Sequence, residues 1–244
     1  SSYTKLGYNA LNMNIAYKLY SLYSRTTIYT YLTYEKADNT EMLNYQNDGL
    51  LHNQNYMDGG EKETVSATLY ANKGLGNLPI DAKLTTTFLW NRNEIAYNSI
   101  PYKMLIGSLK TDLGFASRFK IPFNVEIDGL YNKLTNKVTD LNIDSSDKEI
   151  GGTAKLIFAK NKFASFVTGK WNKIENTSGS KILRDIDFSI SYKIKKFTCK
   201  LSGTNIFHLN GINWLKQNVT PTYTSYVRYK QHSGNVMLSL TYQL

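Results

Sequence analysis

The sequence predicts an all-β chain folded as an antiparallel transmembrane β-barrel, and three observations support this. The final segment, 234–244, reads as a strand with apolar residues on one face and small polar residues on the other. The same two-residue alternation recurs along the chain, and short connections alternate with longer polar ones. In a closed barrel such strands meet lipid on one side and leave no open edge in the hydrocarbon.

Composition is consistent with membrane strands and excludes membrane helices. The 244 residues include 19 Tyr, 10 Phe and 3 Trp but only 4 Pro. Mean hydropathy is −0.39, and the chain has no apolar run of the length, about 18 residues, that a transmembrane helix requires. Barrel strands are only half apolar, so they give a weak hydropathy signal.

The charge and the cysteine count exclude further classes. The formal charge is +10, but the 29 Lys and Arg are scattered and form no basic cluster beside a nucleic-acid-binding motif. Cys199 is the single cysteine, so no disulfide framework or thiolate metal site is expected. We predict no metal and no cofactor.

Strands follow from the alternation of apolar and polar residues. In the segment 186–194, for example, Ile186, Phe188 and Ile190 alternate with polar residues. Two further segments, 26–35 and 163–174, are rich in strand-forming residues but alternate poorly. In chain order, the predicted strands centre on 11–19, 26–35, 65–71, 84–90, 105–115, 123–131, 150–158, 163–174, 186–194, 197–201 and 236–244.

Connections of two lengths alternate along the sequence. The short ones are 21–25, 73–80, 120–122, 160–162 and 195–196. The longer, polar ones are 36–62, 95–103, 136–149, 176–183 and 208–233. Bacterial outer-membrane barrels separate loop lengths in this way, with tight periplasmic turns and larger external loops. A Greek-key sandwich has no reason to do so.

Strand parity predicts about 11 strands that form the C-terminal half of a larger barrel. The last strand runs towards the periplasm, and counting back places the first strand's start outside. Single-chain bacterial barrels have even strand numbers, so we expect residues 1–244 to be a C-terminal portion that lacks a plug domain and N-terminal strands. In this interpretation, residues 220–230 are a β-extension within the last long connection.

Three stretches resemble the C-terminal barrel of Bacteroidetes TonB-dependent receptors, including the SusC-like group. These are Asp187 to Phe207 with its Asn205-Ile-Phe ending, the Tyr-rich segment beyond it, and the closing 236–244. Leu244 departs from the family's usual terminal Phe. The resemblance covers about residues 100–244 and extends to the rest by strand spacing.

The resemblance implies a barrel of about 22 strands in the bacterial outer membrane, plugged by an N-terminal domain and energised by the TonB system. It implies import of a bulky solute, a glycan or a peptide rather than an ion. Expected partners are outer-membrane lipid, the plug, the remaining strands, a SusD-like surface lipoprotein lid and TonB.

Aromatic residues are the candidate site residues. We predict that aromatic residues near the strand ends form two membrane girdles: Tyr20, Tyr34, Trp90, Phe119, Phe123, Tyr131, Trp171, Tyr192 and Tyr242. Exposed rings in the external loops are candidates for stacking on ligand: Tyr45, Tyr56, Trp214, Tyr223, Tyr226 and Tyr229. The alternative interpretation is packing between rings within the sheet and the loops.

No catalytic residues are predicted, and we expect the protein not to be an enzyme. His52, His208 and His232 all fall in predicted loops, and no Gly-x-Ser-x-Gly elbow is present. Two alternatives remain open. One is a complete, smaller outer-membrane barrel acting as a passive pore or hydrolase. The other is a soluble, secreted β-rich adhesin or lectin.

Overall fold

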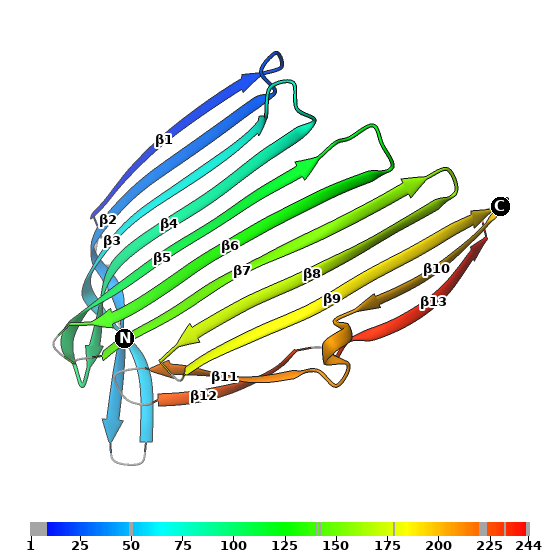
Figure 1. Cartoon of the computed structure of the whole chain (residues 1–244). Helices are drawn as coiled ribbons and strands as arrows, with labels where there is room; N and C mark the ends of the chain where they lie inside the picture. The colour runs from blue at the N-terminus through cyan, green and yellow to red at the C-terminus, as the bar shows by residue number, and fades with distance from the viewer. Residues whose placement is uncertain are drawn as a thin grey trace.

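The computed structural model describes residues 9–48, 51–139, 141, 143–177, 179–219, 224–231 and 233–242. Eleven strands form one curved antiparallel sheet in the order β1 to β10 followed by β13, and β11 and β12 form a separate hairpin (Figure 1). The strands are β1 (Asn9–Ser21), β2 (Thr26–Asp48), β3 (Leu51–Gly74), β4 (Ile80–Tyr97), β5 (Ile100–Ser117), β6 (Phe123–Val138), β7 (Ile143–Lys160), β8 (Phe163–Asn176), β9 (Gly179–Ile194), β10 (Phe197–Thr204), β11 (Ile212–Val219), β12 (Thr224–Gln231) and β13 (Asn235–Tyr242). A single-turn 3-10 helix, η1 (Ile206–His208), follows β10.

The predicted all-β architecture and the eleven strands are confirmed at this level. The sheet is open, because β1 and β13 lie at its two edges and do not pair with each other. No helix in the described ranges is long and apolar enough to cross a membrane. The expected β-extension around 220–230 corresponds to β12, which pairs with β11 outside the main sheet.

The short connections occur where the sequence predicts them. The turns after β1, β3, β5 and β7 lie along the same side of the sheet, where the strands end, and β13 also ends on that side (Figure 1). In the tightest turns Asn161 and Lys195 adopt left-handed backbone conformations, with φ of 56° and 52°. Asparagine tolerates this conformation better than most residues.

The prediction of long loops at the opposite edge is wrong for four of the five connections. Most of 36–62, 95–103, 136–149 and 176–183 is strand, so the strands of these hairpins extend well beyond the predicted bounds. The physical reason is that an antiparallel ladder satisfies backbone groups whatever the side chains are. Alternation is needed only where one face is apolar, so its loss did not mark a strand end.

Cross-strand register places the apolar positions on one face throughout the sheet. Leu84 opposes Leu113, Leu156 opposes Val167, and Leu201 opposes Leu238. One residue further along, polar residues oppose one another, as Glu126 and Lys155 do. We name the two surfaces the apolar face and the polar face. Because the side-chain period is two, every strand keeps this assignment unless a bulge intervenes.

One close backbone contact fixes the last strand to the segment after β10. The Gly234 amide donates to the His208 carbonyl oxygen at 3.0 Å. A Cβ on Gly234 would lie only 2.1 Å from the carbonyl oxygen of Asn205 and 2.6 Å from that of Thr204. Only glycine fits there without moving backbone.

We therefore expect Gly234→Ala to lower the free energy of unfolding by about 1–3 kcal/mol, the usual effect of overpacking a tight site. The measurement is denaturant unfolding of the full-length protein, monitored by circular dichroism. Gly169→Ala is the matched control, because a Cβ there meets no atom within 4 Å. Equal stability of the two variants would contradict the proposed constraint.

Candidate functional site: an apolar face, a polar face and their outer rim

The apolar face is exposed over all of the main sheet rather than covered by a second layer. Along β1, Leu11, Met13 and Ile15 are 53%, 54% and 61% exposed. Leu156 in the middle and Leu240 at the far edge are 61% and 69% exposed. The hydrophobic residues that are buried among those described are few: Ala37, Met42, Ile95, Ala96 and Val138. A soluble protein of this length would bury a far larger apolar core.

Aromatic rings form a row on the apolar face at the edge that carries the short turns. The ring centroids of Phe123 and Phe158 are 4.7 Å apart, and those of Phe197 and Tyr242 are 4.9 Å apart. The register continues this row through Phe163 and Tyr192. Such pairs contribute about 0.5–1.5 kcal/mol beyond their burial. Phe158, Phe163 and Phe197 belong to this row although they were not among the predicted girdle residues.

The other predicted girdle residues fall into two groups. Tyr34, Trp90, Tyr131 and Trp171 all lie on the apolar face towards the outer edge, the edge opposite the short turns. The Tyr34 hydroxyl donates to Glu63 Oε1 at 3.1 Å. Phe119 is in the turn between β5 and β6, and Tyr20 lies on the polar face. From Phe123 to Tyr131 the apolar stretch of β6 is about 26 Å long at the usual rise per residue.

The polar face carries charged residues in local pairs. Lys155 Nζ lies 3.1 Å from Glu126 Oε2, and Lys110 Nζ lies 3.6 Å from Asp112 Oδ2. The Thr153 hydroxyl donates to Asp128 Oδ2 at 3.4 Å. These pairs are partly solvated, so each contributes little to stability. Together they make this face of the sheet hydrophilic.

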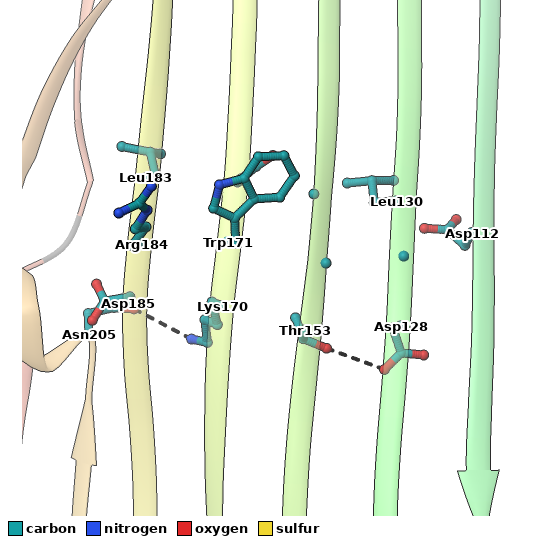
Figure 2. A pocket seen from close by; sticks show the side chains of 14 residues that line it. Asp112, Asp128, Leu130, Thr153, Lys170, Trp171, Leu183, Arg184, Asp185 and Asn205 are labelled. Atoms are coloured by element: carbon teal, nitrogen blue, oxygen red, sulfur yellow. Dashed lines mark hydrogen bonds between the residues drawn. The ribbon is translucent and has the colours of Figure 1, made fainter.

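A hollow of about 360 Å³ lies across β5 to β9, and most side chains that line it belong to the polar face (Figure 2). Gly151 is part of its lining, and a Cβ there would come within 2.8 Å of Asn172 Oδ1. Asp128, Lys170 and Asp185 line it as well. The hollow therefore presents carboxylate, ammonium and amide groups around Gly151, which contributes no side chain.

A polar network holds the segment after β10 against this hollow. His208 Nδ1 lies 2.8 Å from Asp185 Oδ2, and the Phe207 amide donates to Asp185 Oδ1 at 3.1 Å. The Asn205 amide donates to Asp187 Oδ1 at 2.9 Å, and Lys170 forms an ion pair with Asp187. Sequence reasoning missed this network. Its one visible signal was that Asp185 and Asp187 share a face of the strand that precedes β10 and the Asn205-Ile-Phe stretch.

The outer part of the β2–β3 hairpin turns towards the end of β4 and the turn between β4 and β5. Register shifts near Thr40 produce the bend, and Asn44 of β2 then pairs in parallel with Ala96 of β4. Asn44 is fully buried, and its Oδ1 accepts a hydrogen bond from the Ser99 amide at 3.1 Å. The Tyr45 carbonyl oxygen accepts one from the Asn98 amide at 2.8 Å. This hairpin is thus anchored to the rim.

The candidate ligand-binding aromatics lie in two separate hairpins. Tyr45 is half-buried on β2, whereas Tyr56 on β3 is 71% exposed. Trp214 opposes Tyr229 in the β11–β12 register, and Tyr226 opposes Gln217. Tyr223 lies outside the described residues, as does His232. A ligand site shared by the two hairpins stays a prediction.

Few side chains in the described part of the chain are arranged as in a metal site or a catalytic site. No group of three or more His, Cys, Asp or Glu there is arranged to hold a metal ion. The one His–carboxylate pair, His208 with Asp185, has no Ser or Cys at hydrogen-bond distance among the described residues. That pair positions η1.

Comparisons with known proteins give no family assignment. No protein-family model matches this sequence, and no curated protein matches it significantly.

We expect Asp185→Ala to release the segment 205–211 from the polar face. The change removes hydrogen bonds to a carboxylate, each of which contributes about 1.5–3 kcal/mol. Amide hydrogen exchange at Phe207 and His208, measured by mass spectrometry, should accelerate at least about tenfold. Asp112→Ala is the control, because Asp112 lies on β5, four strands away from β9, and forms an ion pair with Lys110 of its own strand. Unchanged protection in Asp185→Ala would contradict the anchoring role.

Proposed function

We propose that this chain forms part of the wall of a bacterial outer-membrane β-barrel. The observation that carries the proposal is the exposed apolar face that continues across all eleven strands, opposite a polar face. Lipid is the environment in which such a face is stable, because exposure of so much apolar area to water is rare in soluble monomers. The aromatic row beside the short turns fits the interfacial girdle of such barrels.

The open sheet supports a larger assembly. Unpaired backbone groups at the edges of β1 and β13 would be very costly in hydrocarbon. Further strands therefore pair with both edges and close the barrel. Eleven strands here and the family resemblance are consistent with a closed barrel of about 22 strands.

The specific role we propose is that of a TonB-dependent receptor similar to the SusC-like proteins of Bacteroidetes. A barrel of this size needs a plug, and the paired charges of the polar face provide a wettable wall against which a plug can be held and moved. The anchored β2–β3 hairpin and the β11–β12 hairpin stand at the external mouth. Their aromatic residues suit capture of a glycan or a peptide by ring stacking.

Ile127→Arg tests the lipid-facing assignment, because Ile127 lies halfway along the apolar stretch of β6 from Phe123 to Tyr131. In lipid an arginine at the membrane midplane destabilises a barrel by about 2–4 kcal/mol, whereas in water the exposed site would tolerate it. The control is Thr168→Arg on the polar face, between Lys155 and Asp187. Urea unfolding of the full-length protein in lipid vesicles measures both. If the two variants are equally stable, the apolar face does not contact lipid.

The transport role has its own test. Deletion of the gene should abolish growth on one class of glycan or peptide offered as sole nutrient, and removal of the TonB system should have the same effect. The full-length protein in planar bilayers should show no steady conductance, because the plug closes it. Unchanged growth on every nutrient, or an open pore without the plug being displaced, would contradict the proposal.

A further inference from the structure

Four basic side chains lie on the apolar face, just beyond the aromatic residues of the outer edge. Lys133, Lys148, Lys173 and Arg184 come from β6, β7, β8 and β9, and we call them the outer basic patch. Arg184 pairs in register with Trp171, and Lys173 pairs with Ile150, which in turn opposes Tyr131. The patch therefore begins where the apolar stretch ends and faces the same way.

Charge within the patch is poorly compensated. Lys133 and Lys148 are directly opposed on neighbouring strands, a placement that puts their Cβ atoms about 5 Å apart and is destabilising for like charges. Glu175 is shared between Lys173, with which it is in direct contact, and Lys148 at 3.9 Å. Lys133 and Arg184, both exposed, have no ion-pair partner among the described residues.

A second sector of the same rim shows that such charges need not be left unpaired. At the same edge of the apolar face, Lys36 opposes Glu63, and Glu63 opposes Arg92. Arg92 Nη2 lies 3.2 Å from Glu63 Oε2 and 3.9 Å from Glu61 Oε2. That sector balances its charge internally, whereas the outer basic patch leaves a cationic surface.

We propose that the outer basic patch binds the phosphate groups of a glycolipid in the outer leaflet. The inference rests on the proposed membrane location. Acyl chains of such a lipid would lie along the apolar stretch of β6 to β9, and its phosphate would reach the cations one or two register rows beyond. A phosphate between Lys133 and Lys148 turns their repulsion into two charge-assisted contacts. Basic residues beside a membrane surface each add about fivefold in affinity for anionic lipid.

The test uses the full-length protein in detergent and compares a patch variant with a matched control. The variant Lys133→Gln, Lys148→Gln and Arg184→Gln removes three charges from the apolar face. The control Lys18→Gln, Lys110→Gln and Lys200→Gln removes three charges from the polar face. Native mass spectrometry measures binding of phosphorylated lipid A and of the same lipid after dephosphorylation.

We expect the patch variant to bind phosphorylated lipid A at least about tenfold more weakly than the unmodified protein, and the control to stay within twofold of it. Dephosphorylation of the lipid should weaken its binding to the unmodified protein by a similar factor. Equal loss in both variants, or equal binding of both lipids, would overturn the inference. Displacement of the lipid by millimolar inorganic phosphate would also overturn it, because the patch would then be a site for free phosphate.

Failure of this inference is separable from failure of the proposed function. A protein that leaves the membrane fraction without detergent is not a barrel wall, and the proposed function fails with it. A protein that needs detergent but binds lipid independently of the patch remains a barrel wall, and only the inference about the patch is lost.

Discussion

The constraint on which the rest of the structure depends is the contrast between the two faces of one sheet. Neighbouring strands are held in register. A shift of one strand by one residue would move all its apolar side chains to the polar face and all its polar side chains to the apolar face. Within the apolar stretch, the register keeps most leucine, isoleucine, valine and phenylalanine residues together from β1 to β13, and it keeps lysine and aspartate residues such as Lys155 and Asp128 on the reverse. With so few buried hydrophobic residues among those described, the sheet has no internal core that would stabilise it in water.

Polar and backbone contacts position the connecting segments relative to these two faces. Asp185 and Asp187 fix the segment after β10 on the polar face, and Gly234 brings the start of β13 against that segment. β13 is thereby positioned as an edge strand of the sheet, beside β10. At the outer rim, burial of Asn44 fixes the bent β2–β3 hairpin. In the barrel that we propose, these anchored elements would lie at the mouth and the two-faced sheet would form the wall.

Most of the sheet could be predicted from the sequence, because period-two alternation reports directly on a strand with one apolar face. The turns at 160–162 and 195–196 were visible for the same reason. The outer hairpins were not, because both faces of residues such as 36–48 lie outside the apolar stretch and carry no alternation. The contacts of Asp185 with His208 could not be found either, since they join residues that are separated by a strand and a turn. Whether the apolar face meets lipid is a property of the environment rather than of the chain's pattern.

Spin labels along β7 test that last point most directly. Each residue from Ile150 to Phe158 would be replaced in turn by a labelled cysteine, in full-length protein with Cys199→Ala, reconstituted into lipid vesicles. Collision rates with oxygen report on lipid, and those with a water-soluble nickel complex report on water. We predict that oxygen accessibility peaks at the even positions 150, 152, 154, 156 and 158, while nickel accessibility peaks at the odd ones. Nickel accessibility that is equally high on both faces would contradict the account.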